Sequence, residues 1–203
     1  MLERIIELAG IVAFAASGAM VGVSKRLDIF GVCAVGVTTG IGGGIIRDLL
    51  LGIHPPASLS EWPNFTTALI ASLLTFFLHP AVRRLRIGVL TLDAVGMGLF
   101  AASGSALALA AGASGLAACL IGGTAAVGGG ILRDILVNEM PLLLHRDLYA
   151  IPALIGSTVV VACSGLGLTS NTGLVVGTVS ASVIRLLALW RHWSLPGPRL
   201  VDD

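Results

Sequence analysis

Charged residues are scarce in this chain of 203 residues: Asp, Glu, Lys and Arg make up 11%, against roughly a quarter in soluble domains. Hydrophobic residues make up 56%, and the mean hydropathy is +0.98. This composition excludes an ordinary water-soluble domain. A spanning helix takes about 20 apolar residues, so the chain is long enough for seven such helices with short connections. No room is then left for a soluble catalytic domain. We therefore expect an all-α integral membrane protein that is not an enzyme.

Cysteine and aromatic residues are few as well, and the net charge is small. The three cysteines are odd in number and lie in apolar stretches, so neither disulfides nor a ligand cluster is expected. The four histidines share no ligand spacing, so we expect no metal and no cofactor. These residues are Cys33, Cys119, Cys163, His54, His79, His145 and His192. A net charge of +1 with 5% aromatics disfavours a nucleic-acid partner.

What the chain does contain is an internal repeat. The segment Phe14-Ala-Ala-Ser-Gly18 returns at 100–104, and Gly-Gly-Gly-Ile-Ile-Arg-Asp at 42–48 returns with one conservative change at 128–134, both after 86 residues. The same offset maps Glu7 onto Asp93. Residues 1–20 resemble a secretory signal, but the copy at 92–104 indicates that they belong to the fold.

Apolar runs between polar, Gly or Pro breaks predict seven spanning helices. Their approximate ranges are 4–23, 29–51, 65–82, 88–110, 115–137, 149–167 and 172–190. Three helices fill each repeat, at 4–85 and 90–171. Because three is odd, the second copy enters the membrane in the opposite orientation, as in inverted-repeat transport proteins. The seventh helix, 172–190, and a cytoplasmic tail, 191–203, lie outside the repeats.

Lys and Arg predict the orientation. They gather in the loops after the first, third and fifth helices and in the tail, at Lys25, Arg26, Arg83, Arg84, Arg86, Arg146, Arg191 and Arg199. The opposite side has little beyond Arg4. By the positive-inside rule, the N-terminus is outside and the C-terminus cytoplasmic in a cell (inner) membrane.

The glycine triplets fall near the middle of the second and fifth helices, at Gly42, Gly43, Gly44, Gly128, Gly129 and Gly130. Each glycine costs roughly 1 kcal/mol in helix propensity, so some gain must offset the triplets. One interpretation is that both helices are kinked there, with freed carbonyls lining a watered pathway. The alternative is close helix packing, which we also expect for Gly18-x-x-x-Gly22, Gly36-x-x-x-Gly40 and Gly173-x-x-x-Gly177.

Charged side chains inside the spans cost about 3 kcal/mol each unless they face partners or water. They are Glu7, Arg47, Asp48, Asp93, Arg133 and Asp134. Neighbours on a helix do not face each other, and depth in the membrane favours the pairs Glu7–Arg47 and Asp93–Arg133. This leaves Asp48 and Asp134 freer to meet water or cations. The alternative is that all six charges only tie helices together.

Hydroxyl groups accompany these motifs and are candidate pore-lining groups. Thr38, Thr39 and Thr124 precede the triplets, and Ser17 and Ser103 lie in the mid-span repeats. The alternative is that each hydroxyl bonds its own helix backbone.

The doubled GIGGGIIRDLLLG and AVGGGILRDILVNEMP motifs, each behind a Phe-Ala-Ala-Ser-Gly segment, resemble the prokaryotic branch of the trimeric intracellular cation (TRIC) channel family. The same bacterial domain carries a "glycine transporter" label. The resemblance, from about residue 4 to 190, implies a homotrimer with a pore in each subunit, passing monovalent cations, chiefly potassium, with kinks at both triplets.

Three functions remain open from the residues. The leading hypothesis is a monovalent-cation channel, selective through Asp48, Asp134 and carbonyls freed at the glycine kinks. A secondary transporter for glycine or another small solute has the same inverted-repeat plan. A membrane scaffold would leave the buried charges unexplained.

Overall fold

The computed structural model describes residues 1–78, 85–144 and 148–195. In these ranges the chain forms eight α-helices and one 3-10 helix. They are α1 (Leu2–Ser24), α2 (Ile29–Leu50), α3 (Ala57–Ser60), α4 (Trp62–Leu78), α5 (Leu85–Ala110), α6 (Gly115–Leu136), η2 (Leu142–Leu144), α7 (Ala150–Gly165) and α8 (Ser170–Arg191). The fold is that of an all-helical membrane protein.

Each predicted apolar segment has a counterpart among these helices. Five of them, α1, α2, α5, α6 and α8, are long and apolar enough to cross a membrane. The helices α4 and α7 are apolar but have 17 and 16 residues, just below the usual spanning length. Seven crossings therefore stay a prediction. The end of the third predicted helix, with His79, lies outside the described residues, as do His145, Arg83, Arg84, Arg146 and Arg199.

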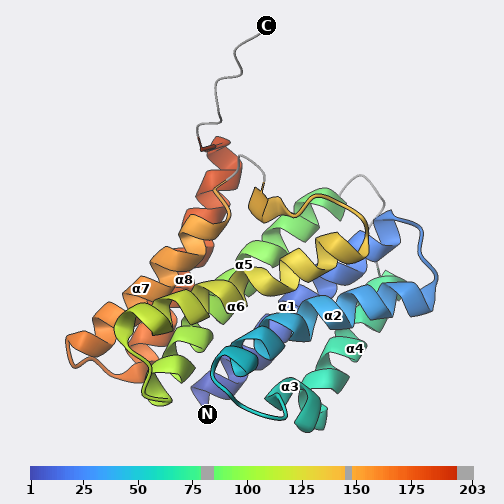
Figure 1. Ribbon diagram of the computed structural model, residues 1–203. Coiled ribbons are helices and arrows are strands. Elements are labelled where there is room, and N and C mark those ends of the chain that lie inside the picture. Colours follow the sequence, from blue (N-terminus) through green and yellow to red (C-terminus); the bar gives the residue numbers. More distant parts are fainter. Residues whose placement is uncertain (79–84, 145–147, 196–203) are drawn as a thin grey trace, which may run out of the picture.

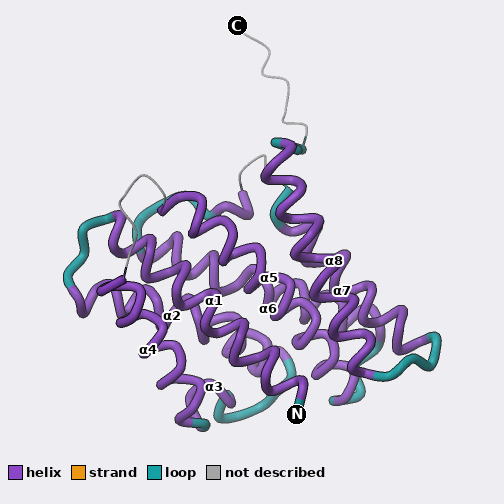
Figure 2. The backbone as a smooth tube through the Cα atoms, turned by 180° about the vertical axis from the view of Figure 1, so that it is seen from behind, coloured by secondary structure: helices purple, strands orange, loops and turns teal. Residues whose placement is uncertain are grey.

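The helices form a bundle with a central group of four. The helices α1, α2, α5 and α6 pack against one another, α4 covers α1 and α2, and α7 covers α5 and α6 (Figure 1). The last helix, α8, lies along α5 and α7. The N-terminus and the end of α8 lie at opposite ends of the bundle (Figure 2). The two halves are thus built alike, and α8 is an addition to the second.

Corresponding helices also begin and end alike in the two halves. Asp28 caps α2 by accepting from Gly31 N, and Ser114 caps α6 by accepting from Ala117 N. After α2 and α6 the chain turns through left-handed residues at Gly52 and Asn138, also 86 positions apart. Asn tolerates this conformation better than most residues. The repeat in the sequence is therefore matched by a repeat in backbone geometry.

The Phe-Ala-Ala-Ser-Gly segments meet at the centre of the bundle. Phe14 and Phe100 are fully buried and stack with ring centroids 5.4 Å apart. Each ring lies against a glycine of the other half, since a Cβ on Gly96 would come within 2.7 Å of Phe14 and one on Gly10 within 2.9 Å of Phe100. These two glycines let α1 and α5 approach closely enough for the rings to stack.

Candidate functional site

The glycine triplets form the crossing point of α2 and α6. A Cβ on Gly43 would lie 2.3 Å from Ala125 O, and one on Gly129 would lie 2.3 Å from Thr39 O. Both distances are far below a van der Waals contact, and the opposing atoms belong to the backbone. Only glycine permits this approach. The close-packing interpretation of the triplets is therefore confirmed, as it is for Gly36, where a Cβ would meet Ala15 O at 2.9 Å.

The unwinding predicted at the triplets is not seen. Both α2 and α6 stay helical from end to end, through residues 42–44 and 128–130. The physical reason is that the contact between the two helices offsets the poor helix propensity of glycine without any break in the hydrogen bonding. Carbonyls freed at the triplets are thus absent here, and a bend of the helix axes in another state stays a prediction.

A first cluster of charges, Glu7, Arg47 and Asp48, lies on one side of the crossing. Arg47 Nη2 donates to Glu7 Oε1 at 3.1 Å, which confirms the predicted pair. Arg47 Nε also donates to Asp48 Oδ1 at 2.8 Å. Asp48 Oδ2 accepts from Ala57 N at 2.8 Å, so this carboxylate caps the start of α3. Arg47 and Asp48 are buried, whereas the side chain of Glu7 is 16% exposed.

A second cluster, Asp93, Arg133 and Asp134, repeats this arrangement on the other side. Arg133 Nη1 donates to Asp93 Oδ1 at 2.7 Å, which confirms the second predicted pair. Arg133 Nε donates to Asp134 Oδ1, and Asp134 Oδ2 accepts from Leu142 N at the start of η2. All three side chains are buried.

The expectation that Asp48 and Asp134 are free to meet water or cations is wrong in this structure. Asp48 is 0% and Asp134 7% exposed, and both oxygens of each carboxylate accept a hydrogen bond. Adjacent helical residues point in different directions, but arginine is long enough for its Nε to fold back to the next residue. The rule that adjacent residues on a helix do not face each other therefore did not exclude this contact.

The hydroxyl groups divide between the two interpretations. Ser17 accepts from Arg133 Nη1 at 2.9 Å and so belongs to the second cluster. Thr39 and Thr124 donate to Val35 O and Leu120 O of their own helices. Thr38 is half-buried and Thr124 is exposed. Ser103 Oγ is buried and has no partner within the described residues.

Two charged contacts extend the clusters in ways the sequence did not indicate. Arg4 bridges Glu7 and Glu61, at 3.0 and 2.7 Å, and so links the first cluster to the surface. On α8, Arg185 is 1% exposed, donates to Leu148 O at 2.8 Å and stacks over the Tyr149 ring. In the sequence, Arg185 is the single charged residue of the apolar segment 172–190. The cost of a charge inside a span, applied to the last helix, was the signal that could have found it.

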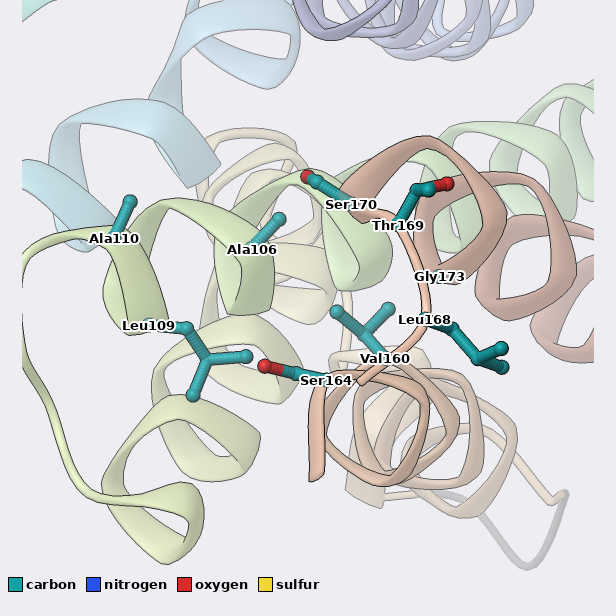
Figure 3. A pocket seen from close by; sticks show the side chains of 9 residues that line it. All are labelled: Ala106, Leu109, Ala110, Val160, Ser164, Leu168, Thr169, Ser170 and Gly173. Atoms are coloured by element: carbon teal, nitrogen blue, oxygen red, sulfur yellow. The ribbon is translucent and has the colours of Figure 1, made fainter. Parts of the chain in front are cut away.

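Two cavities lie along α8, and neither is lined by an acid of the two clusters. One of about 270 Å³ lies between the ends of α5 and α7 and the start of α8, where Ser164, Thr169 and Ser170 line it together with apolar residues (Figure 3). A second, of about 550 Å³, lies between α5 and the end of α8. In the described part of the chain, no three His, Cys, Asp or Glu side chains are grouped to hold a metal ion.

Comparison with known proteins finds one family model and several relatives that match this chain. The family model described as "Glycine transporter" matches twice, at residues 4–80 and 90–165. The UPF0126 inner membrane protein YadS of Escherichia coli is 36% identical over 97% of this chain and 96% of its own length. A UPF0126 membrane protein of Deinococcus radiodurans is 41% identical over 75% of this chain and 72% of its own length.

Solved structures show the same similarity. A channel described in work on conductance through TRIC cation channels has a TM-score of 0.90 and 40% identity, with full coverage of both chains. The TRIC orthologue of Rhodobacter sphaeroides has a TM-score of 0.88 and 36% identity over 94% of this chain and 98% of its own. The chain therefore belongs to the prokaryotic TRIC channel family, whose repeated domain is described as a glycine transporter, and is a multi-pass membrane protein of a channel family, not of an enzyme family.

Proposed function

We propose that this chain is a cation channel that passes monovalent cations, chiefly potassium, and that it works as a homotrimer with one pore in each subunit. The observation that carries the proposal is the crossing of α2 and α6 at Gly43 and Gly129, with a buried acid–arginine cluster on each side. The similarity to solved TRIC channels supports the same function. We place the N-terminus outside and the C-terminus in the cytoplasm.

The charge balance supports passage of cations. The described ion pairs within the first cluster join two acids, Glu7 and Asp48, to Arg47, a net charge of −1. Those of the second cluster join two acids to Arg133, again −1. A negative potential at both ends of a low-dielectric path raises the local concentration of cations and opposes anions. Neither cluster needs to touch the ion to act in this way.

The position of the crossing supports a pore within the subunit. Both triplets belong to one chain, and the contacts of Gly43 and Gly129 correspond by the 86-residue offset. In the conducting state, we propose, α2 and α6 separate at the triplets. Residues 42–44 and 128–130 then line the path together with Ser17, Ser103, Thr38, Thr39 and Thr124. Glycines without side chains leave room for water once the helices part, and the hydroxyls add polar ligands.

Single-channel recording tests the proposal. Purified protein is reconstituted in a planar lipid bilayer under a gradient of potassium chloride. We expect discrete current steps whose reversal potential lies near the potassium equilibrium potential. Saturable exchange of glycine without current steps, measured with labelled glycine in liposomes, would instead support a secondary carrier. Folded protein with neither activity would contradict both.

The proposed homotrimer needs its own measurement. Native mass spectrometry of the protein in detergent separates one, two and three copies by mass. We expect three copies. A pore within each subunit further predicts three equal conductance levels per trimer, whereas a single shared pore predicts one.

A further inference from the structure

Tyr149 fills the space beside the second charge cluster. It is the only tyrosine in the chain and is 2% exposed, although it lies in the linker directly before α7. A Cβ on Gly130 would come within 2.4 Å of Tyr149 Oη and 3.4 Å of Asp93 Oδ1. The third glycine of the second triplet therefore makes room for the phenol, and the Asp93 carboxylate lies near the same position.

Two polar atoms at this contact lack partners. Tyr149 Oη and Asp93 Oδ2 are both buried without a hydrogen-bond partner in the part of the chain that the structure describes. Leaving a buried polar atom unpaired is costly, more so for a charged group. Movement of the phenol that let water reach the carboxylate would remove this cost.

Arg185 holds Tyr149 in place from outside the repeat. Its guanidinium carbon lies 4.8 Å from the centre of the Tyr149 ring, and its Nη1 donates to the carbonyl of the preceding Leu148 at 2.8 Å. A guanidinium stacked on an aromatic face and shielded from water is a favourable contact. One side chain of α8 therefore fixes both the ring and the backbone that carries it.

The first cluster has no such cover. The residue facing its third glycine is Ser58, whose Oγ would lie 2.8 Å from a Cβ on Gly44. Serine is much smaller than tyrosine, and both oxygens of Glu7 have arginine partners there. A Cβ on Gly44 would also lie 3.8 Å from Phe100, but among the described residues the closest side chain there is that of Ser58, whereas at Gly130 it is that of Tyr149.

We propose that Tyr149 closes the ion path at the end of the second cluster, and that Arg185 is its positioning residue. Movement of the phenol away from Gly130 then opens this end. In the orientation proposed above it is the cytoplasmic end. The proposal rests on the proposed channel function and adds to it a closing residue and a role for α8, the helix outside the repeat.

Bilayer recordings of two variants and two matched controls test the closing role. Tyr149→Ala removes the ring, and Arg185→Met removes the stacked guanidinium. Phe30→Ala removes an aromatic ring that is 80% exposed, and Arg191→Met removes a guanidinium stacked on Trp190 at the end of the same helix. We expect open probability to rise about tenfold in Tyr149→Ala and about threefold in Arg185→Met, with unit conductance retained. Unchanged open probability in folded Arg185→Met or Tyr149→Ala would overturn the proposal.

A thiol-accessibility measurement keeps the test independent of current. Cys33, Cys119 and Cys163 are replaced by alanine, and Ser17→Cys is introduced, because Ser17 Oγ lies 2.9 Å from Arg133 Nη1. A small cationic methanethiosulfonate reagent should modify this thiol faster with Arg185→Met or Tyr149→Ala than without them. Equal rates would refute closure by Tyr149. Faster modification in a protein that shows no current would refute the channel function alone.

Discussion

The two charge clusters are built from corresponding residues but differ in their contact with the surface. In the first cluster Glu7 is 16% exposed and continues through Arg4 to Glu61, which is 51% exposed. In the second, Asp93 and Arg133 are 0% and 1% exposed, and Tyr149 lies over them. The repeat supplies the common arrangement, whereas the linker before α7 and the added helix α8 seal one copy. The asymmetry therefore comes from a linker that differs between the two repeats and from α8, which lies outside them.

The largest expected difference between the clusters is in stability. Asp93→Asn should lower the free energy of unfolding by about 3 kcal/mol, because loss of one partner leaves a buried charge poorly compensated. Each arginine keeps its second acid, Asp48 or Asp134, but Glu7→Gln should cost less because the Glu7 side chain already contacts solvent. Thermal unfolding in detergent, followed by tryptophan fluorescence, gives both values. Equal losses would show that burial does not distinguish the clusters.

The glycine crossing should respond equally in both halves. Gly43→Ala and Gly129→Ala each force a methyl group to within 2.3 Å of a backbone carbonyl, and we expect each to cost about 2 kcal/mol of folding stability. Gly42→Ala meets only the end of the Leu132 side chain, which can move, so its loss should be smaller. Gly165→Ala is the control, because no atom lies within 4 Å of its Cβ position.

Unequal losses for Gly43→Ala and Gly129→Ala would show that the two contacts of the crossing are not equivalent. The same unfolding assay measures them, and recordings of variants that fold test whether a tighter or wider crossing alters conductance. Because alanine has the higher helix propensity, Gly165→Ala should not destabilise the protein, and a loss as large there would show that the effect does not come from contact at the crossing.

A double-mutant cycle measures the contact within the first cluster. Arg47→Gln, Glu7→Gln and the double variant are compared by free energy of unfolding. Because the two side chains are in direct contact at 3.1 Å, we expect a coupling of about 1–2 kcal/mol. Additive losses would mean that Arg47 is stabilised by Asp48 alone.

The sequence predicted the features that follow from periodicity and depth. The helices could be predicted from the lengths of the apolar runs. The pairs Glu7–Arg47 and Asp93–Arg133 could be predicted because charges inside a membrane need partners, and each pair lies at equal depth. The hydrogen bonds of Asp48 and Asp134 to the linker amides of Ala57 and Leu142 could not. They depend on how a non-helical segment folds back, and no periodic pattern encodes that path.

The role of the triplets depends on tertiary contact and was open for the same reason. A run of glycines fits a kink as well as a close crossing, and only the position of α6 over Gly43 decides in favour of the crossing. Tyr149 gave no signal at all, because a single aromatic residue at a helix start is ordinary at a membrane interface. Its importance comes from Gly130 and Arg185, which are distant in sequence.

The smallest expected effect is on ion selectivity, and it distinguishes the two acids of the more exposed first cluster. Glu7 is the acid of the two clusters with the most exposed side chain, so its charge acts on ions through water, whereas the charge of Asp48 is balanced within hydrogen bonds. Glu7→Gln should lower the potassium-to-chloride permeability ratio by about two- to threefold, as expected for one charge acting through a largely aqueous medium. Asp48→Asn should change the ratio less in protein that folds. Reversal potentials in asymmetric potassium chloride measure both ratios, and a larger change for Asp48→Asn would place that carboxylate, and not Glu7, beside the ion path.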